Sequence, residues 1–184
     1  MSVERPSVET SATPLAGLML LHSTTHTDHR GSFTRLFCQR EMEPMLGSQR
    51  PVQVNLSVTR EAGTVRGLHF QKSPHAEIKI VRCISGSVFD VAVDLRENSP
   101  TFAQWHGVSL TSDNGLALLI PEGFAHGFQT QTPNSQLLYF HTEYYSPDVE
   151  SGVHCDDPTL AIRWPLPHRN LSARDANLPF LDVD

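Results

Sequence analysis

Cysteine is scarce in this sequence, and its spacing excludes most structural uses of the residue. Three cysteines occur among 184 residues, at Cys38, Cys83 and Cys155. Their number is odd and no two of them form a CxxC motif, so a disulfide framework is not expected. Free thiols are typical of a reducing compartment, and we therefore expect a cytoplasmic protein. Cys83 lies in a β-prone run, where we expect it to act as a small buried hydrophobic side chain.

Long apolar runs and an excess of positive charge are missing as well. No run approaches the roughly 20 apolar residues of a transmembrane helix, and the start of the sequence lacks the apolar segment of a signal peptide. Fourteen basic residues against twenty acidic ones give a net charge of −6, which argues against nucleic acid as a ligand. We therefore expect neither a membrane nor a nucleic-acid partner. A single phosphorylated small molecule, held by a few local arginines, is compatible with this charge.

Helical periodicity is weak, whereas β-prone runs and turn signals alternate along most of the chain. Residues 87–95 show the period of two that is typical of a strand. Short helices are expected only at 40–46 and 172–176, and residues 85–86 and 112–115 predict hairpin turns. The pattern predicts an all-β fold, an antiparallel jelly-roll barrel. Residues 1–16 are expected to form a flexible lead-in, and residues 17–184 a single domain. The predicted strands span residues 17–22, 32–38, 52–59, 64–70, 77–84, 87–94, 105–110, 116–120, 124–130 and 136–142.

Two histidines, His69 and His126, stand in glycine-punctuated strand contexts, RGLHFQ and PEGFAHGF. The glycine and proline spacing that ends at His126 resembles the second motif of the cupin superfamily, a group of jelly rolls. The first cupin motif is only half present, because Gln71 stands where a second metal-binding histidine is usual and Glu77 comes one or two residues late. Lys79 adds a cation to the same region. We therefore expect no metal and no cofactor.

Ordered blocks along nearly the whole chain, from residue 28 to about residue 179, resemble one metal-free branch of that superfamily. This branch is the dTDP-4-dehydrorhamnose 3,5-epimerase family, whose members act on nucleotide-linked 4-keto sugars. So many blocks in order are far more specific than any single motif. The matching blocks span residues 28–33, 53–57, 66–71, 79–82, 90–96, 99–102, 121–128, 139, 144–145, 156–158, 162–165 and 171–175.

The resemblance implies catalysis by proton transfer. The hydrogens on C3 and C5 of a 4-keto sugar are α to the ketone, so a base can remove one and an acid can return a proton to the opposite face. By resemblance, His69 is the base, Asp175 is its partner and Tyr139 is the acid. Lys79 is expected to stabilise the negative charge that develops on the ketone oxygen O4. The implied enzyme is an isomerase of deoxysugar or surface-polysaccharide (O-antigen) biosynthesis, and whether it inverts C3, C5 or both is left open.

The resemblance also implies a homodimer and a set of substrate-binding residues. In this dimer the N-terminal strands are exchanged, so that Arg30 and Phe33 complete the partner's site. Arg35 stands where the family commonly has a glutamate that helps to recognise thymine, so a CDP-linked sugar is an alternative to a dTDP-linked one. The implied substrate-binding residues are Arg30, Phe33, Arg35, Gln53, Asn55, Arg66, His126, Tyr145 and Arg174.

Two further classes of function stay open as alternatives. One is a catalytically silent sugar-binding cupin, which the complete acid–base set disfavours because a binder needs no acid and no base. We interpret Asp90 and Asp94, which alternate on one strand, as structural rather than as an acid–base dyad. The other alternative is a metal-dependent cupin enzyme, which would use His69, His75, Glu77 and His126.

Overall fold

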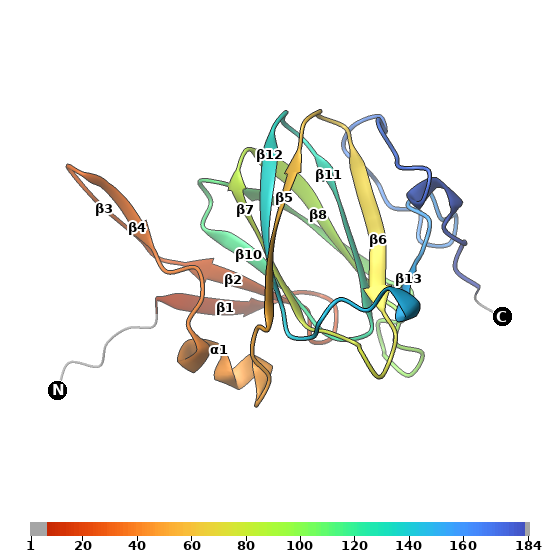
Figure 1. The fold of residues 1–184 in the computed structure, drawn as a ribbon, viewed down its shortest axis with the longest axis horizontal. Coiled ribbons are helices and arrows are strands. Elements are labelled where there is room, and N and C mark those ends of the chain that lie inside the picture. Colours follow the sequence, from red (N-terminus) through yellow and green to blue (C-terminus); the bar gives the residue numbers. More distant parts are fainter. Residues whose placement is uncertain (1–6, 183–184) are drawn as a thin grey trace.

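A computed structural model, which describes residues 7–182, contains two antiparallel sheets that pack face to face as a barrel (Figure 1). The predicted all-β jelly roll is thus confirmed. In spatial order, the larger sheet contains β1 (Val8–Ala12), β2 (Met19–Ser23), β10 (Leu116–Ile120), β7 (Lys79–Ser85), β12 (Ser135–His141) and β5 (Gln53–Thr59). The smaller sheet contains β13 (Glu150–Gly152), β6 (Val65–Gln71), β11 (Phe124–Thr130), β8 (Ser87–Asp94) and β9 (Trp105–Thr111). Outside these two sheets, β3 (Thr25–Asp28) and β4 (Gly31–Thr34) form a two-stranded sheet of their own. The remaining elements are helix α1 (Gln39–Leu46) and the 3-10 turns η1 (Pro147–Val149) and η2 (Asp175–Asn177).

Alternation along the strands supplies both an inner core and two outer ones. On β7, Val81 and Cys83 face the space between the sheets, where they join Phe128 of β11 in the central cluster. Ile80 points the other way and packs with Leu46 of helix α1, which covers the outer face of the larger sheet. This two-sided burial follows from the period of two. Because both faces of these strands are buried, their sequences are nearly continuous apolar runs.

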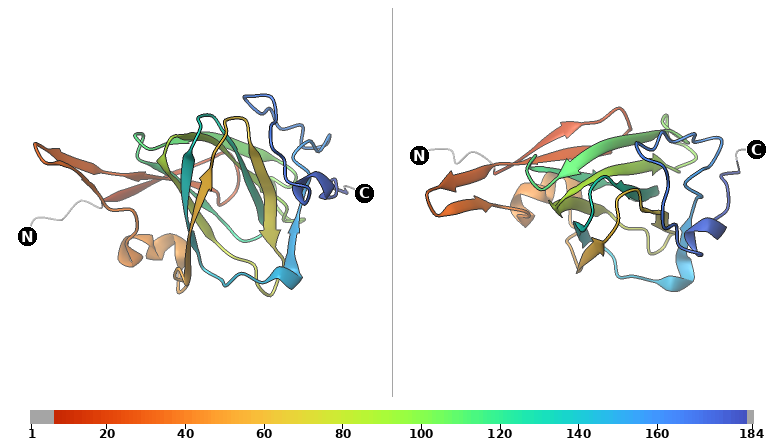
Figure 2. Two further views of the ribbon diagram at one scale, coloured as in Figure 1. Left: turned by 45° about the horizontal axis from the view of Figure 1, so that its top comes forward. Right: turned by 90° about the horizontal axis from the view of Figure 1, so that it is seen from above.

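The outer face of the smaller sheet is covered by the C-terminal segment. Leu68 of β6 and Val91 of β8 pack there against Leu160 and Trp164. The same segment continues to η2 at Asp175, beside β6 (Figure 2). The C-terminal coil therefore brings residues near position 175 to a strand more than 100 residues earlier.

The N-terminal part of the chain differs from the expectation. Residues 8–12, expected to belong to a flexible lead-in, form β1, which pairs with β2 from Val8 opposite Ser23 to Ala12 opposite Met19. Residues 1–6 of that expected lead-in lie outside the described residues. The predicted strand at 32–38 ends at Thr34, and it pairs with β3, which was not predicted. The β3–β4 hairpin projects away from the barrel (Figures 1 and 2).

Both expected hairpin turns are wrong. Gly86 separates β7 from β8, but β7 pairs with β10 and β12 whereas β8 pairs with β9 and β11. Gly86 therefore carries the chain from one sheet to the other, with a φ of 77° that favours glycine. A Cβ at this position would lie 2.6 Å from the Thr132 hydroxyl oxygen. Residues 112–115 likewise connect β9 of one sheet to β10 of the other.

Candidate active site

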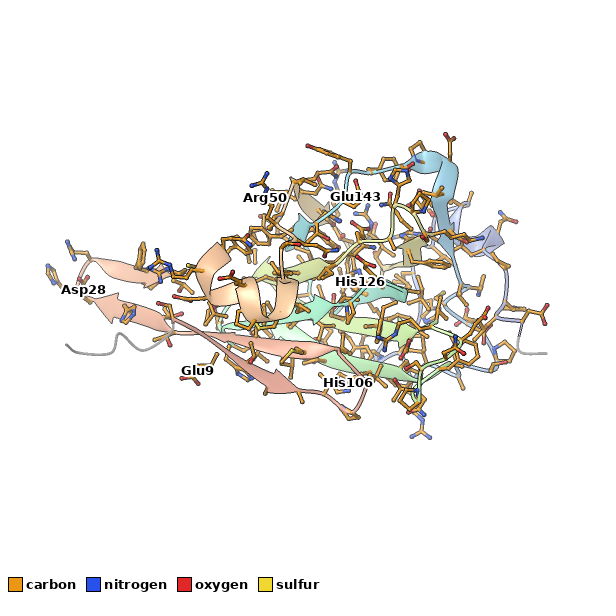
Figure 3. The ribbon with its side chains drawn as sticks, turned by 90° about the horizontal axis from the view of Figure 1, so that it is seen from below. Glu9, Asp28, Arg50, His106, His126 and Glu143 are labelled. Carbon is orange, nitrogen blue, oxygen red and sulfur yellow. The ribbon has the colours of Figure 1, made fainter. Side chains whose placement is uncertain are left out.

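A cavity of about 400 Å³ opens between the two sheets. The smaller sheet contributes His69 from β6 and His126 from β11, which lie opposite each other on neighbouring strands. The larger sheet contributes Tyr139 from β12 and Lys79 from β7. Inward-pointing residues of the two sheets thus meet across one space. Figure 3 shows His126 inside the barrel, far from Asp28 at the tip of the β3–β4 hairpin.

His69 is paired with Asp175 of η2. The two side chains meet at 2.7 Å between His69 Nε2 and Asp175 Oδ1, and the Asp175 side chain is only 6% exposed. Asp175 Oδ2 also accepts a hydrogen bond from the Gly67 amide. A carboxylate only accepts hydrogen bonds, so the ring proton lies on Nε2 and Nδ1 keeps its lone pair. Burial lowers the pKa of His69 below its ordinary value, although the hydrogen bond and the charge of Asp175 oppose this. The ring is therefore neutral near pH 7 and able to accept a proton.

Tyr139 enters the cavity from the opposite sheet. Its ring stacks on His141 at 5.8 Å between centroids, with 13° between the planes, and meets the edge of His126 at 6.0 Å. Burial raises the pKa of the Tyr139 hydroxyl above its ordinary value, and the negative charge of Asp90 adds to this. The hydroxyl therefore stays protonated and can serve as a proton donor.

Lys79 is a cation of the cavity wall, and Glu77 anchors it. Its Nζ lies 3.2 Å from Glu77 Oε1 and donates to the His69 carbonyl at 3.4 Å. The second carboxylate oxygen of Glu77 accepts from His141 Nδ1 at 2.7 Å. The ammonium is thus held at the cavity with a fixed partner on one side, where it can stabilise negative charge on a ligand.

His126 rests on Asp90 of the adjacent strand β8. Its Nε2 lies 3.0 and 2.9 Å from the two Asp90 carboxylate oxygens, and Asp90 is fully buried. Asp90 thus supports a histidine that lines the cavity, which is more than the structural role expected of it. Asp94 fits the structural interpretation, because it binds Arg96 and the Thr101 hydroxyl, each at 2.7 Å.

The polar residues at the cavity mouth come from β5, β6 and the segment after β12. Arg66 Nη1 donates to Ser57 Oγ at 3.1 Å, and the Tyr145 amide donates to Gln53 Oε1 at 3.2 Å. Glu150 joins two further predicted residues, because its carboxylate accepts from the Tyr145 hydroxyl and from Arg174 Nη2, both at 2.7 Å. Among the predicted site residues, those that line the cavity are Asn55, Arg66, His69, Lys79, His126, Tyr139 and Tyr145.

Three predicted binding residues lie apart from this cavity in the single chain. Arg30 pairs with Asp28 at 2.6 Å within the β3–β4 hairpin, and Phe33 of the same hairpin is 70% exposed. Arg35 follows β4, and its Nη1 donates to Glu41 Oε1 of α1 at 2.7 Å. The projecting hairpin thus leaves its arginine and its phenylalanine exposed.

The donor set of the cavity is unsuited to a divalent metal. Gln71, at the position of a cupin ligand, uses its side chain to bind backbone groups of His75, Tyr144 and Ser146. Glu77 is engaged by Lys79, whose positive charge repels a cation. Within residues 7–182, the one group of three metal-ligand side chains whose atoms come within 4.8 Å lies elsewhere, at His154, Cys155 and Asp156. No helix among these residues is long and apolar enough to cross a membrane.

Several residues of the cavity were not predicted to act there. Glu77 was expected only as a ligand of the metal alternative, and no role was predicted for His141 or Glu150. A signal for two of them exists in the sequence: Glu77 lies two residues before Lys79, and His141 two residues after Tyr139. Residues two apart on a strand share a face. Glu150 has no comparable signal, because its partners come from separate segments.

The chain is similar over nearly its whole length to proteins of one family. The family model described as dTDP-4-dehydrorhamnose 3,5-epimerase matches residues 12–182. The enzyme of that name from Salmonella typhimurium is 43% identical over 172 residues, which cover 92% of this chain and 93% of that protein. The crystal structure of dTDP-4-dehydrorhamnose 3,5-epimerase from Bacillus anthracis with TDP and PPi bound matches with a TM-score of 0.91 and 44% identity, over 95% of this chain and 99% of that one.

A second solved structure is similarly close. It is the dTDP-6-deoxy-D-glucose-3,5-epimerase of Legionella pneumophila in complex with dTDP-4-keto-L-rhamnose, with a TM-score of 0.89 and 40% identity over 94% of this chain and 92% of that one. The family model spans the cavity residues on both sheets, and these relatives cover 92–95% of the chain. The chain therefore belongs to the dTDP-4-dehydrorhamnose 3,5-epimerase family, as its sequence blocks predicted, and is a nucleotide-sugar epimerase.

Proposed function

We propose that this epimerase inverts C3 and C5 of a dTDP-linked 4-keto-6-deoxyhexose, with His69 as the base and Tyr139 as the acid. The observation that carries the proposal is the His69–Asp175 pair, at 2.7 Å, on one wall of a cavity whose opposite wall holds Tyr139. Inversion requires a base on one face of the sugar and an acid on the other. Two residues from opposing sheets meet this requirement.

The first half of the reaction is proton removal. Nδ1 of neutral His69 takes the proton from the carbon next to the ketone, and the electron pair of the broken C–H bond moves to O4 as an enolate. Asp175 stabilises the imidazolium that forms and holds the ring in the tautomer with a free Nδ1. Lys79 lies at the same cavity, where its ammonium stabilises the negative charge on O4.

The second half is protonation from the other side. The Tyr139 hydroxyl gives its proton to the carbon on the face opposite His69, which inverts the centre, and solvent restores the tyrosine proton. His69 in turn releases its proton to solvent. Repeating these steps at the second α carbon inverts it as well. No oxidant, metal or other cofactor enters this proton balance.

The remaining polar residues suit a nucleotide diphosphate. Arg66 at the cavity and Arg174 beside it offer the guanidinium groups that bind phosphate oxygens. Gln53, Asn55 and Tyr145 supply hydrogen bonds and a ring face at the cavity mouth, and His126 lies further inside near the sugar. The names of the two solved relatives, with TDP or a dTDP-linked sugar bound, favour dTDP as the nucleotide. Three thiols without disulfide partners are consistent with action in the cytoplasm.

The direct test of this function is solvent-proton exchange. Incubation with dTDP-4-keto-6-deoxyglucose in D₂O should place deuterium at both C3 and C5 of the product, as counted by mass spectrometry. His69→Ala should abolish the exchange at both carbons, whereas His168→Ala should leave it unchanged. His168 is a suitable control, because it pairs with the carboxylate of Asp156 outside the cavity. Exchange by His69→Ala at the native rate would mean that another residue is the base.

We further propose a homodimer in which the β3–β4 hairpin of one protomer completes the site of the other. The hairpin projects away from its own barrel (Figure 1) and leaves Phe33 and Arg30 exposed. The edge strand β5 exposes a row of apolar side chains, at Val54, Leu56 and Val58, which a second copy can cover. Arg30 and Phe33 then act on substrate bound in the partner's cavity.

Mixing two inactive variants tests this shared site. A heterodimer of Arg30→Ala and His69→Ala protomers contains one site with both residues intact, so unfolding and refolding the mixture should recover activity. His69→Ala mixed with Tyr139→Phe is the control, because both lesions lie in the barrel and every mixed site keeps one of them. Absence of recovery in the first mixture, or an active monomer in sedimentation, would contradict the exchange.

A further inference from the structure

Two ionisable residues of the cavity have no part in the proton transfers described above. The Glu77 and His141 side chains are 8% and 13% exposed, and Lys79 beside them is 11% exposed. Buried ionisable groups of this kind commonly stabilise a fold no better than apolar side chains of similar size. Three of them together, next to the acid of the reaction, therefore indicate a functional role.

Glu77 links Lys79 to His141. Its Oε1 lies 3.2 Å from Lys79 Nζ, and its Oε2 lies 2.7 Å from His141 Nδ1. Burial alone would raise the pKa of Glu77, but the hydrogen bond from His141 and the charge of Lys79 outweigh this and hold it below its ordinary value. Glu77 is therefore an anion that fixes two neighbours at once.

The His141 ring is held at both nitrogens. Nδ1–H donates to Glu77, which leaves the lone pair on Nε2, 3.3 Å from the Asn55 amide nitrogen. The ring lies almost parallel to Tyr139, at 5.8 Å between centroids. The two rings share a face of β12 because they are two residues apart. A ring fixed by Glu77 and Asn55 thus forms one wall of the place in which the Tyr139 ring sits.

We propose that Glu77 and His141 are positioning residues of the protonation step, which fix the Tyr139 ring on the face of the enolate opposite His69. This inference rests on the proposed roles of His69 and Tyr139. Glu77 acts through His141 by Oε2 and through Lys79 by Oε1. Neither residue transfers a proton to the sugar itself.

The enolate can be protonated by Tyr139 or by the His69 imidazolium. The ratio of the two products therefore reports whether Tyr139 is correctly positioned. A proton from Tyr139 forms the new C–H bond on the opposite face and gives the epimer. A proton returned by the His69 imidazolium regenerates the starting sugar. In D₂O both acids exchange their protons with solvent, so both products carry deuterium. A displaced Tyr139 should therefore raise the amount of labelled starting sugar relative to labelled epimer.

The experiment is a single-turnover reaction of dTDP-4-keto-6-deoxyglucose in D₂O. The remaining starting sugar and the epimer are separated, and the deuterium in each is measured by mass spectrometry. His141→Ala removes the stacked ring. It should raise the ratio of labelled starting sugar to labelled epimer by roughly 10- to 100-fold, the range expected for a misplaced catalytic group. His141→Phe keeps a ring without its hydrogen bonds and should restore part of the native ratio. Glu77→Gln should raise the ratio and also slow proton removal, because Lys79 loses its anion. Tyr139→Phe marks the upper limit of the ratio.

The control separates positioning from folding. His168→Ala removes a histidine that pairs with a carboxylate outside the cavity and should leave the ratio unchanged. Variants of merely structural residues lower both labelled products together and leave their ratio constant. If folded His141→Ala gives the native product ratio, His141 does not position Tyr139 and the inference is overturned. If His141→Ala does not fold, native product ratios in both His141→Phe and Glu77→Gln overturn the inference equally. Absence of label in the wild-type reaction would instead refute the proposed function.

Discussion

The partnership of His69 and Asp175 can be tested by one isosteric change, Asp175→Asn. The substitution keeps the size of a side chain that is 6% exposed. The amide oxygen can still accept from the Gly67 backbone, which Asp175 Oδ2 does in the native chain. It removes the charge that stabilises the His69 imidazolium. An amide NH₂ aimed at Nε2 would also favour the wrong tautomer of the ring.

The magnitude follows from the geometry. Asp175 Oδ1 and His69 Nε2 are 2.7 Å apart, which puts the centres of the two charges somewhat further apart. Opposite unit charges about 4 Å apart attract by about 4 kcal/mol at an effective dielectric constant of about 20. Each 1.4 kcal/mol or so corresponds to a factor of ten in rate. We therefore expect kcat to fall by about 10³.

The pH dependence should change in a defined direction. Burial lowers the pKa of His69, and Asp175 opposes this by raising it. The rate rises with pH as His69 loses its proton. Without the carboxylate the pKa falls further, so the rising limb of kcat/KM against pH should move to lower pH in Asp175→Asn while the plateau drops.

The assay is the initial rate of epimer formation between pH 4 and 9, with the melting temperature measured in parallel. Asp156→Asn is the matched control, since it removes a carboxylate that faces His168 at 3.3 Å outside the cavity. A plateau within about threefold of the native one, or a limb that moves to higher pH, would refute the role given to Asp175.

Three further expectations concern the rest of the site. Lys79→Met should lower kcat by about 10²–10³ with a small change in KM, as is typical for loss of one preorganised group that stabilises an oxyanion; an unchanged kcat in a rate assay would contradict this role. Treatment with EDTA should leave activity intact, because Gln71 and Lys79 replace what a divalent site needs; loss of activity and its recovery with one specific ion would favour the metal-dependent alternative. Arg35 is held by Glu41 at 2.7 Å, so we expect calorimetric titration to give the same preference for dTDP over CDP, UDP and GDP in wild type and in Arg35→Glu; a shift of preference from CDP to dTDP in that variant would show that Arg35 reads the base.

The sequence alone determined the class of fold and the family, and it supplied much of the proposed catalytic set. Period-two alternation is a local property, so strands such as Ser87–Asp94 could be predicted with their true bounds. His69, Lys79 and Tyr139 could be found because each stands inside a block that resembles the family. The structure then brings them to one cavity.

Only the tertiary structure decided which strands are neighbours and which side chains are partners. Alternation states that Asp90 and Asp94 share a face, but it does not say that this face lines the barrel interior or that His126 lies beside Asp90. Gly86 looks like a hairpin turn in sequence, whereas the chain uses it to change sheets. Asp175 meets His69 across more than 100 residues because the C-terminal coil wraps the smaller sheet. Contacts between segments so distant depend on how the two sheets stack, and this depends on the packing of the whole chain rather than on any local pattern.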